Sequence, residues 1–268
     1  MLRNTKDLEN CVMGATDGNI GHVRDFYFDD AMWVIRFLVV DTGSWLSSRR
    51  VLISPMALGH PNWTDKILPL SITQEQVRNS PDIDTEKPVS RRHEKQLLSH
   101  YGFPRYWEGP GIWEGGIYPD DRPPGAGVVT LPPLAAQPAA TSTHPQSAAD
   151  HKHDDPHLRS CSVVTGYHIK ATDGEIGHIH SLLMDDETWK VRYIVVTTSD
   201  WWLGHQVLVP PQWIQAVSWL DSTVGVDLTQ QAVKDAPPYD AQATLDRAWE
   251  TGVYKHYGRP GYWAEKTP

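Results

Sequence analysis

Cysteine is scarce in this chain of 268 residues, which contains only Cys11 and Cys161. The two do not stand at equivalent positions of the internal repeat described below, which disfavours a disulfide framework, so a reduced, cytoplasmic protein is the simplest interpretation. Long apolar runs are lacking as well. No stretch of 18 apolar residues occurs, and residues 1–10 contain no apolar core of a signal peptide. The sequence therefore predicts a chain that is not inserted in a membrane.

The chain also has no excess of positive charge. Its net charge is −9, and the one basic cluster, Arg91–Lys95, includes its own acid, Glu94. Proteins that bind nucleic acid in general use a footprint of Lys and Arg on the phosphates. Nucleic acid is therefore not the predicted partner.

Catalytic motifs are missing too. The sequence contains no G-x-S-x-G, no H-E-x-x-H, no P-loop and no paired C-x-x-C. We therefore expect no enzyme, no cofactor and no metal site. The segment His151–His157 could chelate a transition metal, but its low-complexity surroundings favour a solvated linker.

What the chain does contain is a long internal repeat. Residues 15–22 (ATDGNIGH) return as residues 171–178 (ATDGEIGH), an offset of 156 positions. Without a gap, residues 14–107 and 170–263 share 33 identities in 94 positions. Self-similarity of this kind predicts one module used twice.

The repeat and the composition divide the chain. We expect a first β domain over 1–84, followed by a helix and a Tyr-Gly-x-Pro-x-Tyr-Trp tail over 85–107. A second β domain is expected over 159–240, with its helix and tail over 241–268. Residues 108–158 between them are rich in Pro, Gly and Ala and predict a flexible linker.

Short strands separated by turns are predicted inside each β domain. In the first repeat they are Cys11–Thr16, Ile20–Asp29, Trp33–Asp41, Arg50–Ser54 and a strand around Trp63–Ile72, with Cys161–Thr172 and Asp221–Leu228 as counterparts of the first and last. Asp17-Gly18 suits a tight turn, and Gly21 indicates a bulge. Thr73 and Ser90 are predicted helix N-caps. Apolar residues on both faces of Ile20–Asp29 favour a closed or doubly covered sheet.

The run Asp-Gly-x-Ile-Gly-His-Val, then Phe-Asp-Asp, Trp-x-Ile-Arg-Phe-Leu-Val-Val-Asp-Thr-Gly and Val-Leu-Ile-Ser-Pro resembles the PRC-barrel family. Residues 14–84 and 170–240 carry the resemblance. The second copy departs at Thr197, where the first has Asp41, and at 202–205. The resemblance implies a mainly β protein with two tandem small barrels, each followed by short helices. It also implies binding to other macromolecules without catalysis.

Repeated residues at the expected barrel rims are the candidate binding residues: Asp17, His22, Arg36, Trp45, Asp173, His178, Arg192 and Trp201. The two His could be metal ligands or proton carriers, although packing against a rim is the favoured interpretation. The Asp residues, with Asp29-Asp30 and Asp185-Asp186, could bind cations, but turn chemistry explains them better.

The repeated Arg and Trp residues can also be interpreted either as structural residues or as binding residues. An Arg amid apolar strand residues needs a carboxylate, for which Glu75, Asp41 or a turn Asp could serve in the first copy. Most of the repeated Trp are expected in cores. Trp45 and Trp201 are predicted in loops, where an aromatic can anchor an interface.

Four hypotheses of function follow. The first is a non-enzymatic interaction module with an unknown protein partner. The second comes from the resemblance to the barrel of the photosynthetic reaction-centre H subunit, and is a soluble accessory of that or another membrane redox complex, peripheral on the inner membrane. The third is a small-ligand or ion binder at the rims, and the fourth is an RNA or ribosome partner by analogy to a maturation factor, which the acidic charge balance disfavours. Duplication further predicts an intrachain pseudo-dimer of the two barrels.

Overall fold

The computed structural model describes residues 1–81, 83, 89–105, 158–198, 205–243 and 245–264. Residues 108–157 of the predicted linker, the tail residues 106–107 and Trp201 lie outside these ranges, whereas Leu158, the last residue expected in the linker, begins a strand. The chain is mainly β, as expected, with two mixed sheets that carry short helices. Its residues group into two compact units: unit 1 is Met1–Leu8, Met32–Val34 and Ser160–Pro268, and unit 2 is Glu9–Ala31 and Ile35–Arg159.

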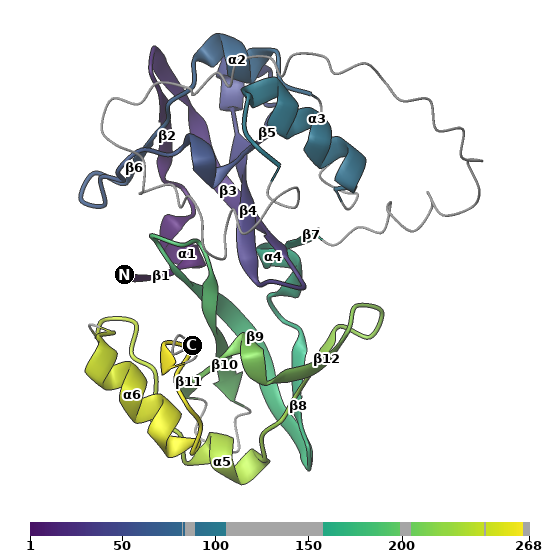
Figure 1. The fold of residues 1–268 in the computed structure, drawn as a ribbon, viewed down its shortest axis with the longest axis vertical. Helices are drawn as coiled ribbons and strands as arrows, with labels where there is room; N and C mark the ends of the chain where they lie inside the picture. Colours follow the sequence, from purple (N-terminus) through teal and green to yellow (C-terminus); the bar gives the residue numbers. More distant parts are fainter. Residues whose placement is uncertain (82, 84–88, 106–157, 199–204, 244, 265–268) are drawn as a thin grey trace, which may run out of the picture. The chain divides into compact units, whose positions relative to one another are not determined.

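The sheet of the first repeat is ordered β5-β4-β3-β2-β6, and β7 also pairs with β3 (Figure 1). The strands are β2 (Val12–Ala15), β3 (Gly18–Asp29), β4 (Val34–Asp41), β5 (Arg50–Ile53), β6 (Ile67–Pro69) and β7 (Leu158–Ser160). The sheet of the second repeat is ordered β11-β10-β9-β8-β13-β12, and β1 also pairs with β9. Its strands are β1 (Leu2–Asn4), β8 (His168–Ala171), β9 (Gly174–Asp185), β10 (Val191–Thr198), β11 (Gln206–Val209), β12 (Ile214–Ser218) and β13 (Thr223–Val226).

The pairings among the described residues do not close either sheet into a barrel. The outer strands are β5 and β6 in one sheet and β11 and β12 in the other. β6 has only three residues and ends at Pro69, whose nitrogen has no hydrogen to donate to a further strand. Of the strand expected over Trp63–Ile72, residues 63–66 form a turn, Ile67–Pro69 form β6, and Leu70 makes an isolated bridge to Leu58.

One further expectation needs correction in the second repeat, and one strand there was missed. Cys161–Thr172 was predicted as one strand, but it forms α4 (Cys161–Val164) and then β8. Ser160 accepts a hydrogen bond from the Val163 backbone N–H at 3.0 Å, which caps this short helix, and Gly166 at φ 93° turns the chain. The hairpin partner β12 was not predicted.

The long strands β3 and β9 bend at a glycine, as predicted. The register opposite β2 skips Ile20, and the register opposite β8 skips Ile176, so each strand has one extra residue beside Gly21 or Gly177. A Cβ on Gly21 would lie 2.0 Å from the Asp41 carbonyl oxygen, and one on Gly177 would lie 2.0 Å from that of Thr197. Only glycine permits this approach of the next strand.

Both faces of β3 are covered, which agrees with its continuous apolar sequence. Phe26 and Phe28 are fully buried, and Tyr27, which points to the opposite face, is 6 % exposed. In β9 the corresponding Leu182, Leu183 and Met184 are equally buried. The core of each unit therefore surrounds its longest strand.

The helices are α1 (Thr5–Leu8), α2 (Gln74–Arg78), α3 (Arg91–Tyr101), α4, α5 (Gln230–Lys234) and α6 (Arg247–His256), with the 3-10 turns η1 (Gly43–Leu46), η2 (Pro55–Ala57) and η6 (Pro211–Trp213). The predicted caps are confirmed: Thr73 forms a capping box with Gln76, and Ser90 accepts from the His93 N–H at 3.3 Å. Within the described ranges no helix has the length and apolar character needed to cross a bilayer.

Each unit contains a strand from the other repeat. β1 precedes the first repeat but pairs with β9 in unit 1, with Leu2 opposite Asp185 and Asn4 opposite Leu183. β7 stands 156 residues later, at the matching place before the second repeat, and pairs with β3 of the first. The two repeats thus exchange their leading strands.

Candidate functional site

The exchanged strands meet a duplicated acidic turn, Asp29-Asp30 after β3 and Asp185-Asp186 after β9. The first carboxylate of each pair holds its own turn. Asp29 Oδ1 accepts from the Ala31 N–H at 3.0 Å, and Asp185 Oδ1 accepts from the Glu187 N–H at 3.0 Å. The interpretation of these residues as turn formers is confirmed.

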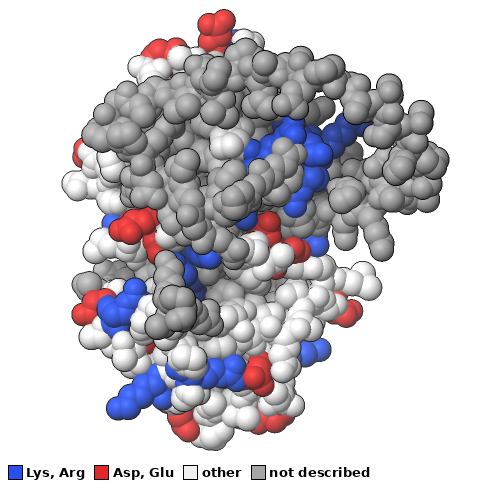
Figure 2. All heavy atoms as spheres, in the orientation of Figure 1, with Lys and Arg blue, Asp and Glu red and all other residues white. Residues whose placement is uncertain are grey.

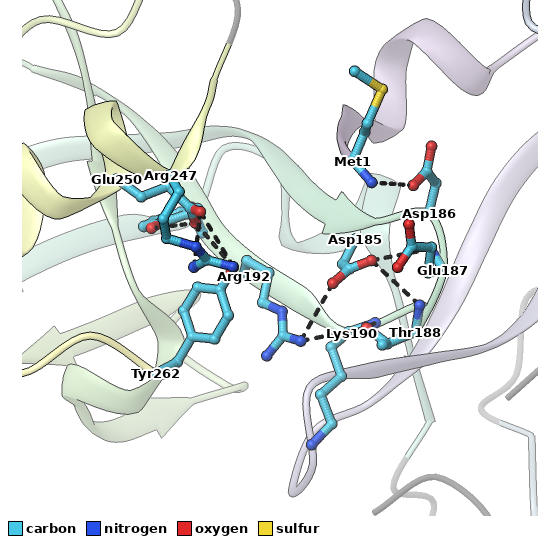
Figure 3. Close-up of polar contacts among 11 residues, drawn as sticks. Met1, Asp185, Asp186, Glu187, Thr188, Lys190, Arg192, Arg247, Glu250 and Tyr262 are labelled. Atoms are coloured by element: carbon cyan, nitrogen blue, oxygen red, sulfur yellow. Dashed lines mark hydrogen bonds and ion pairs between the residues drawn. The ribbon is translucent and has the colours of Figure 1, made fainter. Parts of the chain in front are cut away.

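The same first carboxylate pairs with the repeated strand arginine. Arg36 Nη2 lies 3.8 Å from Asp29 Oδ2, and both side chains are at most 6 % exposed. Arg192 Nη2 lies 3.3 Å from Asp185 Oδ2 (Figure 3). The central carbon of the same guanidinium lies 4.1 Å from the centre of the Tyr262 ring. A turn Asp was one of the partners considered for Arg36, and in the structure Asp29 takes this role.

The second carboxylate binds an arginine from the exchanged strand. Arg3 Nε lies 3.2 Å from Asp186 Oδ2, and Arg159 Nε lies 2.8 Å from Asp30 Oδ2. The Met1 amino group also contacts Asp186 (Figure 3). We did not predict these pairs. The available signal was that Leu2-Arg3 recurs as Leu158-Arg159 at the offset of the repeat.

Each acidic pair is thus balanced by two guanidinium groups in both repeats. Among the described residues, no three His, Cys, Asp or Glu side chains converge in a way that could hold a metal ion. The arrangement is suited to recognition of an arginine-bearing strand, because a carboxylate and a guanidinium form strong, directional hydrogen bonds.

Asp17 and Asp173 fix the neighbouring turn to a helix. Asp17 Oδ1 accepts from the Gln74 N–H at the start of α2, and Asp173 Oδ1 accepts from the Gln230 N–H at the start of α5, each at 2.7 Å. The side chain of each Gln donates back to the turn, to the carbonyl of Asn19 or Glu175, at 2.8 Å. Both Asp residues therefore hold the fold through a contact 57 positions away in sequence.

His22 and His178 are exposed on β3 and β9. His22 borders an open hollow of about 290 Å³ that Asn10, Arg24, Asp41 and Gly43 also line. Another repeated pair, which we did not single out, has a clear structural contact: His100 Nε2 and His256 Nε2 lie 2.7 and 2.8 Å from the carbonyls of Gln76 and Ala232.

Trp45 lies in η1 and is half-buried, with the guanidinium of Arg78 5.7 Å from its ring centre. Part of the ring remains accessible, as an interface anchor requires. Its counterpart Trp201 lies outside the described residues. Over the face of the molecule drawn in Figure 2, acidic and basic side chains are interspersed on the described surface.

A buried carboxylate in the second repeat was not foreseen. Glu250 on α6 is 4 % exposed and accepts hydrogen bonds from the Tyr193 and Tyr262 hydroxyls at 2.8 and 3.0 Å. Arg247 Nη1 lies 3.0 Å from its other oxygen, Oε2, and its guanidinium lies over the rings of Tyr262 and Trp263. This cluster fastens the C-terminal tail to the sheet (Figure 3).

Burial keeps the tyrosines of this cluster protonated. Desolvation and the charge of Glu250 raise the pKa of Tyr193, and burial likewise raises the pKa values of Tyr254, Tyr257 and Tyr262. In unit 2, desolvation raises the pKa of Tyr101 to about 12. Of these hydroxyls, those of Tyr193 and Tyr262 donate to Glu250.

These shifts predict alkaline unfolding. Because the pKa is raised in the folded state, these groups stabilise the fold fully below pH ~10, and this contribution is lost as the pH rises toward their folded values. Each tyrosine that stays protonated in the fold lowers the free energy of unfolding by up to about 1.4 kcal/mol per pH unit above pH ~10. Tyrosinate absorbance and circular dichroism, recorded together, test this. Part of the ten tyrosines should ionise only as the fold is lost, and uniform ionisation near pH 10 in the folded protein would contradict it.

No family model matches the chain, and no curated protein matches it.

Proposed function

We propose that this chain is a tandem PRC-barrel protein that acts as a non-enzymatic interaction module. The observation that carries the proposal is the shared use of the duplicated polar residues. In both repeats Asp17/Asp173 bind a helix start, Arg36/Arg192 pair with the turn, and His100/His256 bind a helix carbonyl. Residues kept in both copies thus serve the fold itself.

Catalysis uses groups of a different kind. A general acid, base or nucleophile needs a side chain free to meet substrate. The buried carboxylate Glu250 already accepts from two hydroxyls and pairs with Arg247. These occupied groups support the non-enzymatic interpretation, and the accessible part of Trp45 supports an interface in the first repeat.

A pull-down from the native cell with matched variants tests the proposal. The full chain should retain at least one protein, and Trp45→Ala combined with Trp201→Ala should reduce the retained amount at least tenfold, because aromatic anchors carry much of the energy of an interface. Exposed Arg92 on α3 supplies the control, since Arg92→Ala should bind as the wild type does. If nothing is retained, or if the double variant binds equally well while folded, the proposal fails.

The accessory of a membrane redox complex and the small-ligand binder stay predictions. The hollow beside His22, which Arg24 and Asp41 also line, is one place where a small ligand can be sought. The pseudo-dimer of two barrels likewise stays a prediction about the whole chain.

A further inference from the structure

The strand pairing suggests what the outer edge of β9 is built to bind. One edge of β9 pairs with β10 along its length. On the opposite edge, β8 pairs with Gly174–His178 and β1 pairs with Leu183–Asp185. Without β1 this end of a buried strand would present unpaired backbone N–H and C=O groups, which cost free energy unless another strand covers them.

Side chains add selectivity to this backbone pairing. Besides the ion pair of Arg3 with Asp186, Asn4 Nδ2 donates to Ser181 Oγ at 3.0 Å, and both residues are buried. On β3 the matching strand β7 contributes the Arg159–Asp30 pair, and Leu158 is 3 % exposed. Each edge therefore takes an apolar residue followed by an arginine that reaches the second Asp of the turn.

We infer that β1 and β7 are recognition strands, by which the two halves of the chain bind one another independently of the covalent linker. Each half supplies a Leu-Arg strand and, at the end of its long strand, the edge and carboxylate that receive the strand of the other half. The interaction surface is strand addition at β3 and β9, and its partner is the complementary half-molecule. This inference holds whether or not the protein binds a further partner.

Cleavage of the intact, folded chain tests the inference. A specific protease site is inserted between Ala139 and Ala140, and the purified full-length protein is cut. Native mass spectrometry and size-exclusion chromatography then report whether the fragments stay together. We expect one species that contains both. Separation of the fragments, folded or unfolded, overturns the inference.

Charge reversal identifies the strands as the cause. Arg3→Asp with Arg159→Asp should raise the dissociation constant of the cut protein about 100-fold, tenfold for each strand, where tenfold corresponds to about 1.4 kcal/mol. Restoring complementarity with Asp30→Arg and Asp186→Arg should recover most of the affinity. Arg92→Asp on the exposed face of α3 is the matched control and should leave the affinity unchanged.

The outcomes are distinct. Unchanged association after charge reversal would mean that other contacts hold the halves, and it overturns the role of the strands. Loss without recovery in the fourfold variant would mean damage to the fold rather than recognition, and it overturns the inference as well. Recovery in the fourfold variant, with Arg92→Asp unaffected, supports it.

Discussion

Gly21→Ala is expected to destabilise unit 2 by about 3 kcal/mol or more, because the new Cβ would meet backbone that cannot move aside. It would lie 2.0 Å from the Asp41 carbonyl oxygen and 2.9 Å from the Thr42 Cα. Glycine at φ 139° also has a conformation that alanine rarely adopts. For the described part of this unit, on the order of 100 residues, this corresponds to a melting temperature lower by roughly 10–20 °C.

Calorimetry of Gly21→Ala beside two other glycine variants checks this result. Gly59→Ala is the control, because its Cβ would lie 3.6 Å from the Pro69 side chain, an ordinary contact. It should change stability by less than about 0.5 kcal/mol. Gly177→Ala should repeat the large effect in unit 1, where the Thr197 carbonyl takes the place of Asp41. Equal stability of Gly21→Ala and Gly59→Ala would show that the strands do not approach as described.

Glu250→Ala should cost about 3–5 kcal/mol in unit 1. The change removes the acceptor of the Tyr193 and Tyr262 hydroxyls and the partner of Arg247, so polar groups at a buried site lose these contacts together. Urea unfolding measures the loss. Glu187→Ala, an exposed acid of the same unit, should fall within about 0.5 kcal/mol of the wild type.

Tyr193→Phe separates the hydrogen bond from the charge. It introduces the residue that the first repeat has at this position, Phe37, and should cost only about 1 kcal/mol, the usual value of one hydrogen bond. A loss as large as that of Glu250→Ala would mean that the hydroxyl, not the carboxylate, organises the cluster. If Glu250→Ala left the free energy of unfolding unchanged, the cluster would not stabilise unit 1.

Local features of this fold were readable from the sequence. The bulges at Gly21 and Gly177 and the caps at Thr73 and Ser90 depend on residues close together in the chain, where turn and cap chemistry is specific. The repeat strengthened each prediction because both copies had to satisfy it. The mainly β character was predicted from the short strands and the turn residues between them.

Contacts between distant residues were not readable in this way. β1 has three residues, too few for a period, and pairs with residues more than 170 positions away. Asp17 was assigned to its own turn, although its carboxylate binds Gln74. Glu250 escaped notice although the repeat offered a signal, since Glu94 and Arg91 match Glu250 and Arg247, and Glu94 is buried as well. Its hydrogen bond with Tyr193 could not be read from the repeat, because the first copy has Phe37 at that position.

The position of β1 also bears on how the protein is made. β1 leaves the ribosome before its partner residues Leu183–Asp185, which follow about 180 residues later. At roughly 5–20 residues per second, the segment waits on the order of 10–40 s for the strand it pairs with. Unit 1 can therefore finish folding only late in synthesis, and until then Leu2 and Leu8 are open to chaperones.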